Sequence, residues 1–181
     1  FGGYYFEDEE LLGVGQAILE EQLEEQILSD GGHFERSTMY HCILLERMMD
    51  CYNLVVNNDV FEKNELEDKL KTKTQLMLGW LGKMTIDGRT GRGDGENHDR
   101  GQVTNDRHLP LFNDGAKGIA PSSEELFEYA SRLGLQETEV GLSSSGYRRY
   151  STDTFYLICD VGEIGPDYQP GHAHSDTLSF V

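Results

Sequence analysis

The spacing of apolar residues changes once along this chain of 181 residues, near residue 141. Before that point apolar side chains recur every three or four residues, which is the period of an amphipathic helix. After it, apolar and polar side chains alternate over short runs, as in β-strands. Helices followed by strands indicate an α+β chain. We therefore predict a helical domain over residues 1–140 and the start of a sheet domain over residues 141–181.

Four segments have the pattern of helices, and they cover residues 9–28, 37–54, 60–84 and 122–133. The second segment is apolar on two sides, which predicts a helix packed between neighbours. The four helices are expected to run as successive antiparallel neighbours. Strands are expected over residues 147–150 and 154–161, with a third beginning at Thr177. The stretch from about 85 to 121 is rich in Gly, Asp and Asn and predicts a long loop of the kind that forms a lid or lacks order.

The formal net charge of −18 argues against some classes of function. A strongly acidic chain repels phosphate groups, so neither nucleic acid nor an anionic membrane is an expected partner. The sequence has no apolar run long enough to span a bilayer. Its three cysteines are widely spaced and form neither a disulfide framework nor a zinc-binding CxxC pattern.

Ionisable side chains gather where the second predicted helix begins, in the segment DGGHFERSTMYH at residues 30–41. It contains His33, Glu35, Arg36, Tyr40 and His41. A helix N-terminus has free N–H groups and the positive end of the helix dipole, which suit a carboxylate ligand. The alternative is structural, because tyrosine at this spacing also fits a helix core.

Two later segments carry further candidates. Asn113 follows an apolar run and could donate its amide to a substrate carboxylate, or it could simply form an Asn-Asp turn. His172 and His174 alternate ahead of Asp176, so they point the same way if that segment is extended. Such a cluster could bind zinc, or it could place one imidazole in a cleft.

Three motifs resemble those of the heparinase II/III-like family of bacterial polysaccharide lyases, and they occur in that family's order: DGGHFERSTMYH at 30–41, FNDGAKGIAP at 112–121 and GPDYQPGHAHSDTLSF at 165–180. The resemblance implies part of an α/α toroid followed by the first strands of an antiparallel β-sandwich, with a cleft between them. It also implies a fragment of a longer polypeptide, located in the periplasm or outside the cell and inactive by itself.

The resemblance also implies roles for individual residues. His172 matches the functional histidine of the family's β domain. Glu35, Tyr40 and His41 match the toroid signature beside the cleft, although Thr38 stands where relatives commonly have proline. The family generally needs a toroid tyrosine, and four alternatives are open for it: Tyr40, Tyr168, a position outside this fragment, or its absence. No cofactor is required by the resemblance, but His174 and Asp176 match positions that bind a metal such as zinc or calcium in some relatives.

The predicted activity is β-elimination on an acidic polysaccharide, either a glycosaminoglycan or another uronate polymer. Asn113, Arg36 and His33 are predicted to bind substrate. The negative charge of the chain favours a less charged polymer over a heavily sulfated one. Two alternatives remain: an α/α-barrel glycoside hydrolase using Glu35 and Asp114, and a non-catalytic protein that binds carbohydrate or assembles surface polysaccharide.

Overall fold

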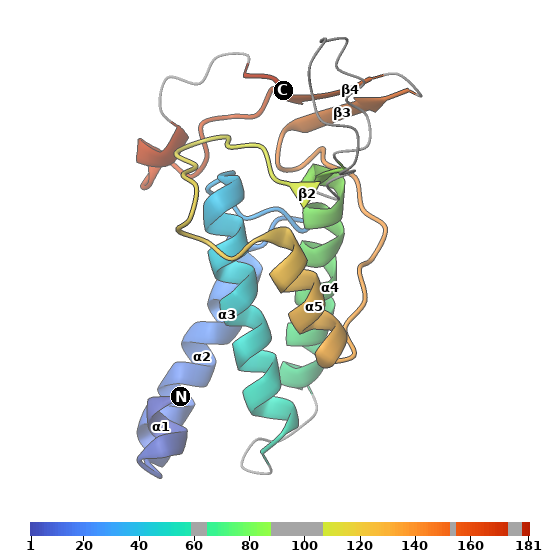
Figure 1. Cartoon of the computed structure of the whole chain (residues 1–181). Helices are drawn as coiled ribbons and strands as arrows, with labels where there is room; N and C mark the ends of the chain where they lie inside the picture. The colour runs from blue at the N-terminus through green and yellow to red at the C-terminus, as the bar shows by residue number, and fades with distance from the viewer. Residues whose placement is uncertain (59–64, 88–106, 153–154, 174–178) are drawn as a thin grey trace.

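A computed structural model describes residues 1–58, 65–87, 107–152, 155–173 and 179–181. Figure 1 shows a layer of helices with a β-hairpin across one end, the chain's N-terminus lying at the opposite end. The helices are α1 Gly2–Tyr5, α2 Glu9–Gln26, α3 Thr38–Val56, α4 Glu65–Met84, α5 Ser123–Arg132 and the 3-10 helix η2 Pro170–Ala173. The strands are β1 Ile86–Asp87, β2 Arg107–His108, β3 Tyr147–Ser151 and β4 Tyr156–Asp160.

The predicted order of helices followed by strands is confirmed. Helices α2 to α5 coincide with the four predicted segments to within a few residues wherever these are described, whereas residues 60–64 lie outside the described residues. Side-chain caps explain two of the starting points. Asp8 accepts a hydrogen bond from the Leu11 amide, and Ser122 forms a capping box with Glu125. The sequence did not predict α1 or the short β1–β2 pair.

Helix α3 lies in the middle of the helical layer, in contact with α4 and α5 (Figure 1). Leu45 and Met49 are fully buried on it, and Cys42, Tyr52 and Val55 are nearly so. The prediction of a helix packed between neighbours is therefore confirmed. Among the described residues, no helix combines the length and the apolar character needed to cross a membrane.

The hairpin of β3 and β4 is antiparallel, with Tyr147 opposite Asp160. Residues 179–181 add to its edge, where Ile158 and Val181 exchange two backbone hydrogen bonds of 3.0 and 2.9 Å. The predicted start of this third segment at Thr177 lies outside the described residues. A small apolar cluster that includes Trp80, Tyr147 and Ile158 packs the hairpin onto the end of α4.

A buried hydrogen-bond group also joins the sheet to the loop that follows α2. The amide and hydroxyl of Ser145, just before β3, donate to Oδ2 of Asp30 at 2.7 and 2.9 Å. The indole nitrogen of Trp80 donates to the Ser145 hydroxyl at 2.9 Å. Because all three side chains are buried, this group fixes residues 30–36 against the sheet.

The segment between α5 and β3 passes close to α4 at Gly79. A Cβ atom at Gly79 would lie 1.9 Å from the carbonyl oxygen of Thr138. Glycine is therefore required there by close approach of two backbones. Gly13 in α2 is exposed, and a Cβ there would meet nothing within 4 Å.

We predict that Gly79→Ala lowers the free energy of unfolding by about 1–3 kcal/mol, because the segment that contains Thr138 must shift away from α4. The matched variant Gly13→Ala should raise it by roughly 0.5–1 kcal/mol, since alanine is the better helix former. Urea unfolding of the two variants measures both changes. Equal stability of the two variants would show that Gly79 is not a point of tight packing.

Candidate functional site

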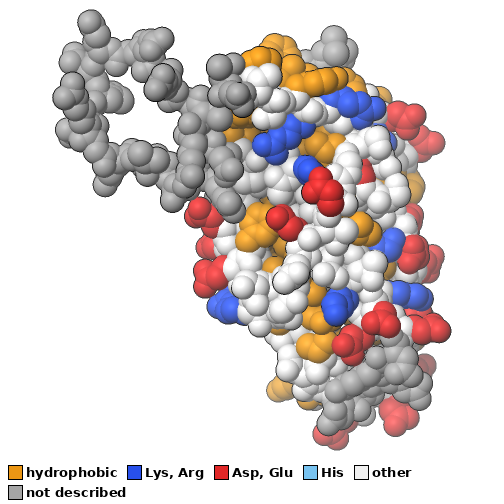
Figure 2. Space-filling model, turned by 90° about the vertical axis from the view of Figure 1, so that its right-hand side faces the viewer, with side chains coloured by type: hydrophobic (Ala, Val, Ile, Leu, Met, Phe, Trp, Pro, Cys, Tyr) orange, Lys and Arg blue, Asp and Glu red, His pale blue; other side chains and the backbone are white. Residues whose placement is uncertain are grey.

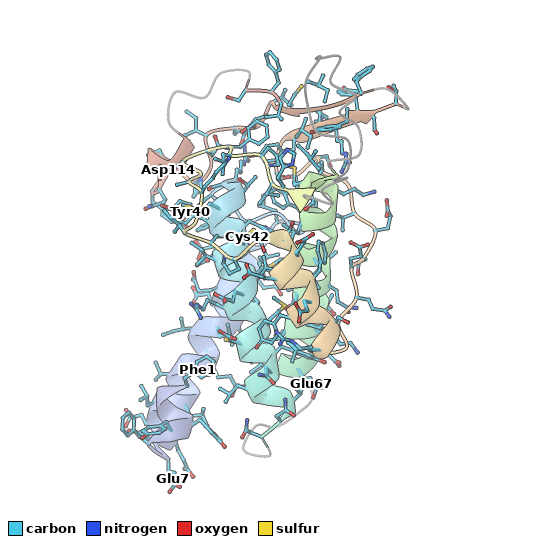
Figure 3. The ribbon with its side chains drawn as sticks, in the orientation of Figure 1. Phe1, Glu7, Tyr40, Cys42, Glu67 and Asp114 are labelled. Atoms are coloured by element: carbon cyan, nitrogen blue, oxygen red, sulfur yellow. The ribbon has the colours of Figure 1, made fainter. Side chains whose placement is uncertain are left out.

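Three loops meet at the end of the helical layer that faces the sheet. They are residues 30–37 before α3, residues 109–118 after β2, and residues 161–169 after β4. The Tyr40 hydroxyl lies 3.3 Å from Oδ2 of Asp114, and the rings of Phe34 and Tyr168 lie 6.2 Å apart. Figure 3 shows Tyr40 and Asp114 together at this end, far from Phe1 and Glu7 at the other. The structure thus brings parts of all three sequence motifs together.

Tyr40 lies in the first turn of α3, where Ser37 is the N-cap. Its phenol donates a hydrogen bond to Asp114. Burial raises the pKa of the Tyr40 phenol, and the nearby charges of Asp114 and Glu35 raise it further. A phenol in such surroundings keeps its proton at neutral pH, so Tyr40 is poorly suited to act as a tyrosinate base.

The backbone that presents Asp114 to Tyr40 is strained. Asn113 and Asp114 have φ angles of 50° and 59°, in the left-handed region. Such a conformation costs roughly 1–3 kcal/mol for a residue other than glycine, although Asn and Asp tolerate it best. Two consecutive residues of this kind need support from their surroundings, and strained turns of this type are common at functional sites.

The support comes from the Asn113 side chain, which is only 7% exposed. Its amide nitrogen lies 2.7 Å from Oδ2 of Asp160, 3.2 Å from the Arg36 carbonyl and 3.3 Å from the Tyr147 hydroxyl. The N–H groups of Asn113 are therefore directed into the protein. In this arrangement they do not face a substrate, so the predicted role of Asn113 in substrate binding gains no support.

Arg36 and Thr38 tie the entry of α3 to the neighbouring loops. The Arg36 guanidinium donates to the carbonyl of Glu163, and the Tyr147 hydroxyl donates to the Arg36 carbonyl at 2.6 Å. Thr38, at the position where relatives commonly have proline, donates its hydroxyl to the Pro110 carbonyl at 2.7 Å. Both residues hold loops together.

The two histidines of the first motif lie below the surface. His33 is 5% exposed and contacts the ring of Phe34. His41 is fully buried, its Nε2 lies 3.1 Å from the Met77 carbonyl, and its ring lies 4.2 Å from that of Trp80. Burial and then the nearby His33 lower the pKa of His41 to about 3. The His41 imidazole is therefore neutral at ordinary pH and belongs to the core beneath the loops.

Residues 165–173 of the third motif run beside the first motif. The Tyr168 hydroxyl donates to Oε1 of Glu25 at 2.6 Å, which raises the pKa of Tyr168 and lowers that of Glu25. The backbone of His172 lies in η2, four residues further along the chain (Figure 1). His174 and Asp176 lie outside the described residues. Within the part of the chain that is described, no three His, Cys, Asp or Glu residues form a metal-binding group.

A large groove of about 1120 Å³ lies elsewhere, between α4, residues 137–143 and β3. As far as the described residues show, none of the predicted site residues lines it. Lys83 and Arg149 do line it, but Lys83 pairs with Glu139 and Arg149 donates to the Lys83 carbonyl. Figure 2 shows acidic and basic side chains intermixed on the face of the molecule that is turned toward the viewer.

Asp160 and Tyr147 are the site residues that the sequence did not point to. Both lie in the hairpin, and their partners Arg36 and Asn113 are distant in sequence. An aspartate that ends a strand gives no signal by itself, because such residues usually face solvent. The only sign in the sequence was the Asn-Asp pair of the second motif, which predicted a turn but not its partner.

Comparison with known families agrees with this arrangement of motifs. A family model described as "Heparinase II/III N-terminus" matches residues 7–130, and one described as "Heparinase II/III-like, C-terminal" matches residues 137–181. The chain belongs to the heparinase II/III-like family, a family of polysaccharide lyases. Searches of curated proteins and of solved structures gave no match.

We predict that Asp114→Asn lowers the pKa of Tyr40, because it removes a negative charge that lies beside the phenol. Glu35→Gln should lower it less, since Glu35 contributes less than Asp114 to the raised pKa. NMR titration of ring-labelled tyrosines measures both shifts.

The matched control is Asp50→Asn, because Asp50 accepts a hydrogen bond from Tyr129 at 3.0 Å and raises the pKa of that tyrosine instead. It should shift Tyr129 and leave Tyr40 in place. An unchanged Tyr40 titration in Asp114→Asn would contradict the pairing of the two residues.

Proposed function

We propose that this protein is a polysaccharide lyase that cleaves a uronic-acid polysaccharide by β-elimination. The observation that carries the proposal is the placement of the Tyr40 phenol at the junction where the three motifs meet. Membership of the heparinase II/III-like family supports the reaction class. We further propose that the helices form part of an α/α toroid, and that the hairpin begins a β-sandwich.

β-Elimination makes three demands on the protein. The uronate carboxylate must be neutralised so that the proton on C5 becomes acidic. A base must then remove this proton, and an acid must protonate O4 as the C4–O4 bond breaks and a C4=C5 double bond forms. Proton transfers of this kind are commonly performed by tyrosine and histidine side chains.

Tyr40 fits the role of the acid. Its phenol carries a proton at neutral pH and lies where the three motifs meet, so it can transfer that proton when a leaving oxygen develops negative charge beside it. The base in this proposal is His172, whose backbone lies in η2 after the segment that contacts Phe34. The proton on C5 passes to the imidazole, and the phenol proton passes to O4. After the reaction His172 releases its extra proton to solvent and Tyr40 takes one up, so both residues return to their starting states.

Neutralisation of the carboxylate falls to Glu35 in this proposal. The alternative donor, Asn113, directs its N–H groups to Asp160 and to the Arg36 carbonyl. Glu35 acts as a negative charge beside Tyr40 in the free protein. It would take up a proton when the uronate carboxylate binds next to it, because two carboxylates that lie close together favour sharing one proton. These steps need no metal ion, and a metal-binding role for His174 and Asp176 stays a prediction.

In the full-length protein, Tyr40→Phe and His172→Ala should each lower kcat by about 10²–10⁴-fold, the usual contribution of a positioned acid or base. Product formation is followed by the ultraviolet absorbance of unsaturated uronate ends, with a panel of uronate polymers as substrates. Tyr129→Phe is the matched control, because Tyr129 also donates to an aspartate but lies on α5. Its activity should equal that of the unaltered protein.

Two outcomes would contradict the proposal. Cleavage that leaves no double bond would favour the hydrolase with Glu35 and Asp114 as its carboxylates. Binding of a polymer without any cleavage would favour the non-catalytic alternative.

A further inference from the structure

We propose that Asp160 is a positioning residue for this reaction, because it accepts the amide hydrogen bond of Asn113 and so holds the left-handed turn that presents Asp114 to Tyr40. The inference rests on the proposed lyase function only for its kinetic consequences. Asp160 touches neither Tyr40 nor Asp114 among the described contacts, so it acts through Asn113.

The position of the Asp160 carboxylate is set by the hairpin itself. Asp160 is the last residue of β4, opposite Tyr147, and is 9% exposed. Its Oδ1 accepts the backbone N–H of Gly162 at 2.9 Å. Gly146 and Gly162 lie so close that a Cβ at Gly146 would be 2.2 Å from the Gly162 Cα. The carboxylate is therefore held in one place before it meets Asn113.

Both oxygens of Asp160 are used. Oδ1 accepts from Gly162, and Oδ2 accepts from the Asn113 amide at 2.7 Å. An asparagine at position 160 has one acceptor oxygen and could satisfy only one of these donors. The Asn113 Oδ1 atom is buried and has no hydrogen-bond partner among the described residues, so the amide is anchored by its nitrogen alone.

The hydrogen bond of Asn113 affects Tyr40 through Asp114, which is the next residue in the chain. Asn113 and Asp114 share the strained turn, and the carboxylate of Asp114 accepts from the Tyr40 hydroxyl. If the anchor is lost, the turn can relax toward ordinary backbone angles. Asp114 would then leave Tyr40, although no atom of Tyr40 or Asp114 has been altered.

The first test is Asp160→Asn in the full-length protein. We expect kcat to fall by about a hundredfold with KM little changed, as misplacement of a catalytic group by about 1 Å can produce. We also expect Tyr40 to titrate at lower pH, since Asp114 no longer stands beside it. If Asp160→Asn changes neither the pKa of Tyr40 nor kcat, the proposal is overturned.

The second test exchanges the two partners. Asn113→Asp alone puts two carboxylates face to face across the 2.7 Å contact and should impair kcat as much as Asp160→Asn or more. The double variant, Asn113→Asp with Asp160→Asn, restores an amide–carboxylate pair and leaves an oxygen for Gly162, although an aspartate at position 113 no longer donates to the Arg36 carbonyl. It should recover part of kcat and part of the raised pKa of Tyr40. A double variant in which the pKa of Tyr40 is no higher than in Asn113→Asp would overturn the proposal.

Val55→Ala is the control for a general loss of stability. Val55 is buried in the helical core near the C-terminal end of α3 and belongs to none of the three loops that meet at Tyr40. This variant should unfold more easily while keeping kcat and the Tyr40 titration. If it lowers kcat as much as Asp160→Asn does, the effect of Asp160 is only structural and the proposal fails.

The two proposals fail in different ways. The Tyr40 titration reports on Asp160 whether or not the protein cleaves a polymer. If the unaltered protein forms no unsaturated product, the proposed function fails, and the titration alone still decides whether Asp160 positions the turn.

Discussion

A buried hydrogen bond between the Asn113 amide and the Asp160 carboxylate joins the helical layer to the sheet. It links a loop that carries Asp114 to a hairpin that also contacts the helical layer through an apolar cluster around Trp80 and through the hydrogen bond from Arg149 to the Lys83 carbonyl. A hydrogen bond to a buried charged group is among the stronger polar interactions in proteins. The position of Asp114 beside Tyr40 depends on this bond, because without it the strained turn would be free to relax.

Negative charge exceeds positive charge around Tyr40. Carboxylates from Glu35 and Asp114 lie near Tyr40 and keep its phenol protonated. Arg36, the nearest cation of the first motif, is already engaged by Glu163. Under the proposed function, this excess of negative charge favours a sparsely charged uronate polymer over a heavily sulfated one.

The sequence predicted what depends on local periodicity and capping. Helices α2 to α5 and the hairpin followed from the spacing of apolar residues and from caps such as Ser122. It could not predict which way polar side chains turn when their partners are distant. Asn113 faces Asp160, 47 residues away, and His41 lies on a helix that is apolar on two sides, so its burial against Trp80 is a tertiary effect. The family motifs marked the loops that meet at Tyr40, and the fold shows which of their side chains hold those loops together.

The central claim is that the sugar chain lies at Tyr40, between the loop of Asp114 and η2. A crystal structure of the full-length Tyr40→Phe variant with a bound uronate oligosaccharide tests it most directly. The account predicts a sugar ring against the phenylalanine at position 40, with its carboxylate near Glu35 and with residues 170–173 on its other side. An oligosaccharide seated instead in the groove of Lys83 and Arg149, away from position 40, would contradict it.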